Sequence, residues 1–212
     1  MLSEIFKLFW KTVEKKDARR INSQTPPTEI KQFCDIQYID DGLWQHRLDV
    51  YSKSGKLSHR PVIIDIHGGG WMYGTKEINK NYCLVLAQND YVVVNINYRL
   101  APDFSVADQL RDCFFAFKWV STNIEKYGGD LNNVFVTGDS AGGFLAAYSA
   151  LLNSSDRLRK VFGVTESGLE FRACGLTSPV CFMNTHTFQD VYYSRVKLSL
   201  IHISEPTRPE RI

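Results

Sequence analysis

The stretch Gly138-Asp139-Ser140-Ala141-Gly142-Gly143 separates a short apolar run, residues 134–137, from a longer segment, residues 141–152, that is apolar on almost every side. The short run predicts a buried strand, and the longer one predicts a helix buried between a sheet and its neighbours. The pattern Gly-x-Ser-x-Gly between them is typical of a sharp strand-to-helix turn that exposes a serine hydroxyl. Glycines on both sides tolerate the backbone and the close packing that such a turn requires. Taken alone, the pattern is also compatible with a glycine-rich turn that performs no chemistry.

The rest of the chain alternates between short β-rich runs and longer helical ones. The expected strands are residues 36–39, 46–51, 61–66, 91–98 and 133–137. The expected helices between them include residues 76–89 and 105–127. Strands that alternate with helices indicate a mostly parallel sheet with helices on both faces, so we expect an α/β domain.

The composition narrows the class of protein. The 212 residues are 44% hydrophobic and 23% charged with a formal net charge of +2, which disfavours both a disordered chain and a nucleic-acid binder. No long apolar run is free of charges, so we expect no membrane span. Five cysteines with irregular spacing favour neither a disulfide framework nor a metal site, and we expect a reducing, cytoplasmic compartment.

A second glycine motif, His67-Gly68-Gly69-Gly70-Trp71, directly follows the expected strand at residues 61–66. Glycines leave backbone N–H groups unobstructed, so Gly68 and Gly69, with Ala141, are predicted to form an oxyanion hole. A phosphate-binding loop does not fit, because neither of its glycine signatures occurs. The two motifs together predict acyl-transfer chemistry with Ser140 as nucleophile.

These motifs resemble those of the hormone-sensitive-lipase-like esterases of the α/β-hydrolase fold. Three further stretches share the likeness: Tyr98-Arg99-Leu100-Ala101-Pro102, Asp112 after it, and Tyr127-Gly128-Gly129-Asp130. The resemblance implies a carboxylic ester hydrolase that acts on a small-molecule ester without metal or cofactor. It gives Ser140 the nucleophilic role and assigns the oxyanion hole to Gly68, Gly69 and Ala141. It also implies that residues 171–180 form the next core strand and its exit.

The remaining motif residues are expected to support the site. We expect His67 to support the glycine loop rather than to act as the base, and Asp139 to point away across the turn. The motif residues with supporting roles are His67, Gly70, Gly138, Asp139 and Gly142.

Residues 1–28 are predicted to form an amphipathic helix and a proline-containing linker. Apolar side chains recur at helical spacing through residues 2–13, with Lys and Arg on the other faces. The resemblance makes this helix part of a cap over the substrate pocket, whereas its basic character also allows weak contact with an anionic membrane surface. Residues 29–195 are then the α/β-hydrolase core.

The C-terminal part departs from the family pattern. The α/β-hydrolase triad runs Ser, then Asp or Glu, then His, but the chain has no Asp-Pro motif for the acid. Its last histidines, His186 and His202, do not lie where the family places its own. Residues 199–209 resemble a translated sequencing adapter, with a short natural tail as the alternative. We therefore expect a core incomplete at its C-terminus, a non-native segment at residues 196–212, and an inactive chain.

The sequence is also compatible with two other functions. A non-catalytic homologue that keeps the pocket and lacks the triad histidine would bind a small ligand. A peptidase or amidase would use the same fold and the same serine.

Overall fold

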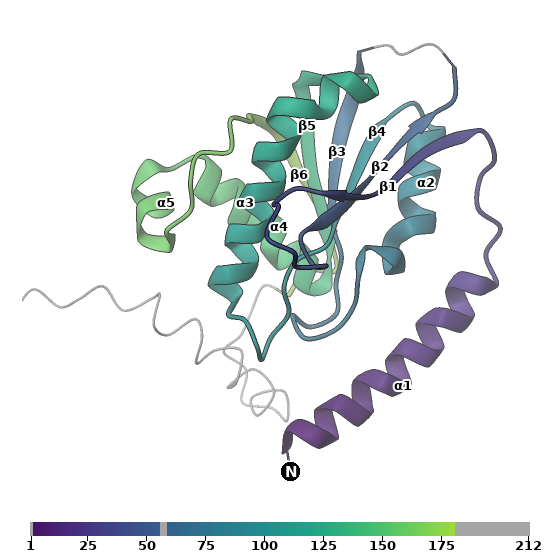
Figure 1. Ribbon diagram of the computed structural model, residues 1–212, viewed down its shortest axis with the longest axis vertical. Coiled ribbons are helices and arrows are strands. Elements are labelled where there is room, and N and C mark those ends of the chain that lie inside the picture. Colours follow the sequence, from purple (N-terminus) through teal and green to yellow (C-terminus); the bar gives the residue numbers. More distant parts are fainter. Residues whose placement is uncertain (1, 56–58, 181–212) are drawn as a thin grey trace, which may run out of the picture.

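A single sheet organises the computed structural model, which describes residues 2–55 and 59–180 (Figure 1). Its strand order within the described residues is β1-β2-β4-β3-β5-β6. The strands are β1 (Ile30–Gln37), β2 (Arg47–Lys53), β3 (Arg60–Ile66), β4 (Val92–Ile96), β5 (Gly129–Asp139) and β6 (Phe171–Thr177). Strands β3 to β6 pair in parallel, whereas β1 and β2 pair antiparallel. This confirms the prediction of a mostly parallel sheet.

Helices cover both faces of the sheet, as the sequence predicts. They are α1 (Leu2–Asn22), α2 (Lys80–Gln88), α3 (Val106–Asn123), α4 (Ser140–Asn153) and α5 (Asp156–Phe162), with 3-10 turns η1 (Lys76–Asn79) and η2 (Ile124–Tyr127). Helices α3 and α4 pack on one face and α2 on the other, while α1 extends along the outside of the molecule (Figure 1). None of the described helices has the length and apolar character needed to cross a membrane.

The two faces divide the core according to strand alternation. On β4, Val92, Val94 and Ile96 belong to a large apolar cluster with α3 and α4, while Val93 belongs to a smaller cluster with α2. Successive side chains of a strand point to opposite faces, so a nearly continuous apolar strand requires cover on both sides. The apolar runs in the sequence are therefore explained by burial on two faces.

Two elements differ from the sequence prediction. Strand β1 begins at Ile30, ahead of the expected start at residue 36, because it is an edge strand with mostly exposed side chains and no apolar alternation. Helix α5 was not expected. It is one short element that Ser155 caps at its start and Gly163, with φ 62°, ends. The proposed tail at residues 196–212, together with His186 and His202, lies outside the described residues.

Candidate active site

Ser140 lies at the junction of β5 and α4 with a φ of 50°, which is rare for a residue other than glycine. Its flanking glycines are required by close approach. A Cβ on Gly138 would lie 2.5 Å from the carbonyl carbon of Gly142, and a Cβ on Gly142 would overlap the carbonyl oxygen of Ile66. The backbone thus forms the sharp strand-to-helix turn that the sequence predicts at this serine.

The glycine loop lies beside this turn because β3 and β5 are parallel neighbours. Ile66 pairs with Gly138, so residues 67–71 leave the sheet at the same edge as Ser140. Gly69 has a φ of 120°, and a Cβ there would overlap the carbonyl oxygen of Tyr73. Met72 and Tyr73 donate their N–H groups to the Gly69 carbonyl, which closes the loop into a tight turn. Both motifs therefore meet at the carboxyl ends of adjacent strands.

The Asp139 side chain joins the two motifs. Its Oδ1 accepts a hydrogen bond from the Gly68 N–H at 2.9 Å and another from the Asn79 side-chain amide at 2.9 Å. A Cβ on Gly68 would overlap Asp139, so the contact needs glycine there. The Gly68 N–H, one of the three predicted oxyanion donors, consequently already has an acceptor in this structure.

His67 is buried beneath the glycine loop. Its Nδ1 lies 2.7 Å from the Gly68 carbonyl oxygen, and its ring stacks on Tyr98 with 4.4 Å between centroids. Burial lowers the pKa of His67 to about 4, so the imidazole is neutral near pH 7. Tyr98 also donates its hydroxyl to the His67 carbonyl at 2.8 Å. These contacts hold the start of the loop in place.

Within residues 2–55 and 59–180, no side chain forms a hydrogen bond with the Ser140 hydroxyl. The two described histidines other than His67 do not form this hydrogen bond either. His59 is exposed ahead of β3, and His46 is buried between two carboxylates. In the same part of the chain, no cluster of His, Cys, Asp or Glu could hold a metal ion.

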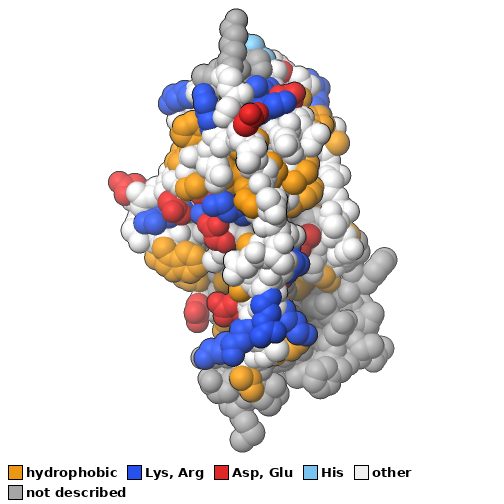
Figure 2. Space-filling view, turned by 90° about the vertical axis from the view of Figure 1, so that its right-hand side faces the viewer, with side chains coloured by type: hydrophobic (Ala, Val, Ile, Leu, Met, Phe, Trp, Pro, Cys, Tyr) orange, Lys and Arg blue, Asp and Glu red, His pale blue; other side chains and the backbone are white. Residues whose placement is uncertain are grey.

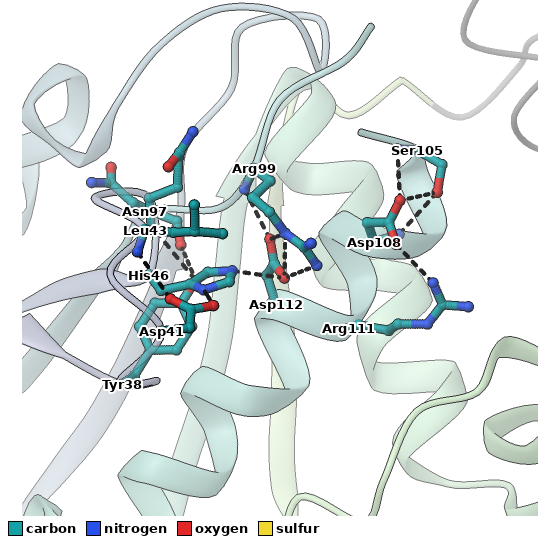
Figure 3. Close-up of polar contacts among 11 residues, drawn as sticks. Tyr38, Asp41, Leu43, His46, Asn97, Arg99, Ser105, Asp108, Arg111 and Asp112 are labelled. Carbon is teal, nitrogen blue, oxygen red and sulfur yellow. Dashed lines mark hydrogen bonds and ion pairs between the residues drawn. The ribbon is translucent and has the colours of Figure 1, made fainter. Parts of the chain in front are cut away.

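A buried ion-pair network supports the loop that follows β4 (Figure 3). Asp112 accepts hydrogen bonds from both the backbone and the guanidinium of Arg99 and lies 3.2 Å from His46 Nε2. On its other side, His46 Nδ1 lies 2.7 Å from Asp41. Burial opposes the charged imidazole, but the hydrogen bond and charge of Asp112, then those of Asp41, raise the pKa of His46 overall. The Arg99 and Asp112 motif residues therefore connect the β1–β2 loop to α3.

A pocket of about 400 Å³ lies between α1 and the residues that follow the glycine loop. Trp10 of α1 stacks on Tyr73 with 5.0 Å between ring centroids, and the Tyr73 hydroxyl donates to Asp17. Apolar lining residues come from both sides, among them Trp10, Trp44, Met72, Leu100, Pro102 and Phe104. Helix α1 therefore covers an apolar hollow next to the site.

Two residues of the site escaped the sequence analysis. Asp65 and Asn79 lie behind the glycine loop, with the Asn79 amide 2.9 Å from Asp65 Oδ2. Burial raises the pKa of Asp65 to about 7. A charged residue inside the apolar run 61–66 was the available signal for Asp65. Nothing in the local pattern marks Asn79.

A serine at a strand-to-helix turn beside a glycine loop, on a mostly parallel sheet, defines the α/β-hydrolase class. The sequence model of the BD-FAE family matches residues 48–175. That match covers more than half of the chain, which therefore belongs to this family, among the hormone-sensitive-lipase-like esterases.

The similarity to individual proteins supports this family assignment. Esterase B from Lactobacillus rhamnosis has a TM-score of 0.87 and 31% identity, covering 96% of this chain and 64% of that one. Versiconal hemiacetal acetate esterase of Dothistroma septosporum is 38% identical over 98 residues, or 46% of this chain and 30% of that protein. Carboxylesterase NlhH of Mycobacterium tuberculosis is 32% identical over 145 residues, or 66% of this chain and 45% of that protein. The matches to the last two span less than half of each relative's length.

Proposed function

We propose that the protein is a carboxylic ester hydrolase that acts through an acyl-enzyme at Ser140. The main support for this proposal is the strained turn at Ser140, which lies beside a glycine loop. The Asp139 side chain joins that loop to the turn. The Ser140 hydroxyl attacks the ester carbonyl, a histidine accepts its proton, and water later releases the acyl group. No cofactor or metal takes part.

The oxyanion is stabilised by the N–H groups of Gly69 and Ala141. Ala141 is in the first turn of α4, where backbone N–H groups lack acceptors within the helix and the helix dipole favours negative charge. The Gly68 N–H, in this proposal, holds the loop through Asp139 instead of facing the substrate. His67 is not the base, because it is buried and its Nδ1 contacts the Gly68 carbonyl. The base is an imidazole from outside the described residues.

The substrate is a small-molecule ester whose apolar part occupies the pocket beneath α1. Residues 1–28 then act as a cap over the core of residues 29–195. A cytoplasmic location agrees with the unpaired state of Cys34, Cys83, Cys113 and Cys174.

Hydrolysis of p-nitrophenyl butyrate by the full-length protein tests the nucleophile. We expect Ser140→Ala to abolish hydrolysis and Ser154→Ala, an exposed serine at the end of the same helix, to leave it unchanged. Substantial activity in the Ser140 variant contradicts the proposal. Faster cleavage of matched nitroanilides than of esters favours the amidase alternative.

A non-catalytic ligand-binding function is the second candidate. It is favoured by the absence, among the described residues, of a hydrogen-bond partner for the Ser140 hydroxyl. A folded full-length protein that binds a non-hydrolysable ester analogue but hydrolyses neither esters nor amides supports this second function against the first.

We also propose that α1 makes weak contact with anionic membrane surfaces. Trp10, Val13, Asp17 and Ile21 form its half-buried face. The exposed side carries Leu8, Phe9, Lys11, Lys15, Lys16 and Arg19. Figure 2 shows Lys and Arg side chains gathered on the lower part of the molecule, where α1 lies. Cosedimentation with vesicles containing phosphatidylserine should fall in Lys15→Glu/Arg19→Glu and stay unchanged in Lys118→Glu/Lys126→Glu. Equal loss in both double variants contradicts it.

A further inference from the structure

A line of polar side chains runs behind the glycine loop, from β3 to the Ser140 turn. Asp65 is fully buried on β3, Asn79 ends η1, and Asp139 ends β5. The Asn79 Nδ2 lies 2.9 Å from Asp65 Oδ2 and 2.9 Å from Asp139 Oδ1. The same Asp139 oxygen accepts the Gly68 N–H at 2.9 Å. One side-chain amide therefore reaches both carboxyl groups.

The chemistry of an amide suits this position. A side-chain NH₂ group has two hydrogens, so a single nitrogen can donate to two acceptors without carrying a charge. The negative charge of Asp139 lies close enough to Asp65 to disfavour ionisation of the latter, and a donor between the two carboxyl groups offsets that repulsion. Asn79 thus determines where the Asp139 carboxylate rests.

The Asn79 side chain does not form the hydrogen bond that is usual for an asparagine at its position. Asn79 is the N-cap residue of α2, where an asparagine side chain normally accepts a hydrogen bond from a backbone N–H of the first turn. The structure shows no such side-chain hydrogen bond at this cap. The side-chain amide instead donates to Asp65 and Asp139.

We propose that Asn79 is a positioning residue for the oxyanion hole. It holds the Asp139 carboxylate against the Gly68 N–H, which sets the direction of the next peptide group and so the Gly69 N–H beside Ser140. Asp65 takes the second hydrogen of the amide and fixes the orientation of Asn79. This inference rests on the proposed ester hydrolysis at Ser140.

The test compares Asn79→Ser and Asn79→Asp with the parent chain. Serine and aspartate are both good N-cap residues, so α2 is retained, but neither can donate from an amide to the two carboxyl groups. Asn89→Ser, at the far end of α2, is the matched control, because its amide contacts only the exposed end of its own helix. The thermal unfolding midpoint of each variant reports whether the fold is intact.

The first measurement is hydrogen exchange of the Gly68 amide by NMR, which needs no catalysis. We expect exchange to accelerate by roughly tenfold or more in both Asn79 variants and to stay unchanged in Asn89→Ser. The second measurement is hydrolysis of p-nitrophenyl butyrate by the full-length protein, for which kcat should fall roughly 10- to 100-fold in the Asn79 variants with little change in KM.

Unchanged Gly68 exchange in folded Asn79 variants overturns the proposal. So does a change in KM alone, which would mean that Asn79 shapes the substrate pocket rather than the oxyanion hole. If Gly68 exchange is faster in the Asn79 variants but the full-length protein hydrolyses no ester, the role of Asn79 in positioning the loop is supported and the proposed esterase activity is contradicted. The two proposals can therefore fail separately.

Discussion

Ser140 and Trp71 are residues other than glycine with φ values of 50° and 62°, one in each of the two motifs. Such conformations cost of order 1–3 kcal/mol each and persist only where the surroundings enforce them. For Ser140 the surroundings are the end of β5 and the first turn of α4. For Trp71 they include the hydrogen bond from the Ala101 N–H to its carbonyl at 2.8 Å. Two of the six described non-glycine residues with positive φ therefore lie in the motifs where the proposed reaction needs fixed geometry.

Gly69→Val should lower kcat about 10²- to 10³-fold, or about 3–4 kcal/mol, with little change in KM. A side chain at φ 120° would overlap the Tyr73 carbonyl, so the loop must move and take its N–H away from the oxyanion. The measurement is steady-state hydrolysis of a nitrophenyl ester by the full-length protein.

Gly55→Val is the control for this substitution, because Gly55 has the same φ of 120° but nothing within 4 Å of its added Cβ. It reproduces the backbone strain without the overlap. An effect on KM alone at Gly69, or an equal loss of kcat at Gly55, would show that the Gly69 N–H does not bind the oxyanion.

At the scale of elements, α3 begins with a complete capping box. The Ser105 hydroxyl accepts the Asp108 N–H, and the Asp108 carboxylate accepts the Ser105 N–H at 2.9 Å. Burial acts against the charged carboxylate, but the hydrogen bonds from Ser105 lower the pKa of Asp108 overall. The box sets the first turn of the helix that carries Asp112.

Ser105→Ala should destabilise the fold by about 1 kcal/mol, because it leaves an N-terminal N–H of α3 without its acceptor. Urea unfolding followed by circular dichroism measures the change. Thr122→Ala, at an exposed position near the end of the same helix, should change the free energy of unfolding by less than about 0.5 kcal/mol. Equal effects from both substitutions would remove any special role for the capping box.

His46 should make stability depend on pH. Burial acts against its charge, but Asp112 and Asp41 raise its pKa overall, and Arg99 and Tyr38 also lie in this network. A raised pKa in the folded state means that the stabilisation is complete below the unfolded value of about 6.5 and is lost as pH rises through the folded value.

The free energy of unfolding, measured across this pH range, should therefore differ most between the parent chain and His46→Gln at pH below about 6.5. The difference should shrink as the pH rises. His59→Gln, which changes an exposed histidine, is the control substitution. A constant difference across the pH range would mean that His46 contributes packing rather than charge.

At the scale of the whole molecule, the two faces of the sheet are unequally covered. The α3 and α4 face holds the large core cluster, whereas the α2 face holds only Tyr51, Cys83, Leu84, Ala87 and Val93 as buried apolar residues of its cluster. Beside this smaller cluster lies an open hollow of about 280 Å³ that Tyr91 lines. Rearrangement after a mutation is therefore easier on the α2 face.

Leu110→Ala should destabilise the protein more than Leu84→Ala, with both changes within about 2–5 kcal/mol. The two leucines are buried to nearly the same degree, so the removed surface is similar and the difference comes from the cavity that each substitution leaves. Equilibrium unfolding in urea gives both values. The opposite order would mean that the α2 face is the more rigid of the two.

Most of the architecture follows from local patterns. The apolar runs of β3, β4 and β5, the segments between them and the two glycine motifs predict the sheet and its helices, because strand and helix periodicity are properties of neighbouring residues. Strand β1 and helix α5 are the exceptions. The first lacks an apolar face, and the second is too short for its periodicity to stand out.

Two features of the candidate site could likewise be predicted from residues close in sequence. They are the turn at Ser140, with the glycines that its backbone requires, and the glycine loop after β3. The hydrogen-bond and ion-pair partners of these groups could not be predicted from the sequence. Asp139 takes up the Gly68 N–H, Asn79 reaches Asp65 and Asp139, and His46 lies buried between Asp41 and Asp112. Most of these contacts join residues from different elements, and their distances follow from the register of β3 against β5 and from the packing of η1 and α3. Periodicity along a chain carries no information about that register, which arises only when the strands pair and the core closes.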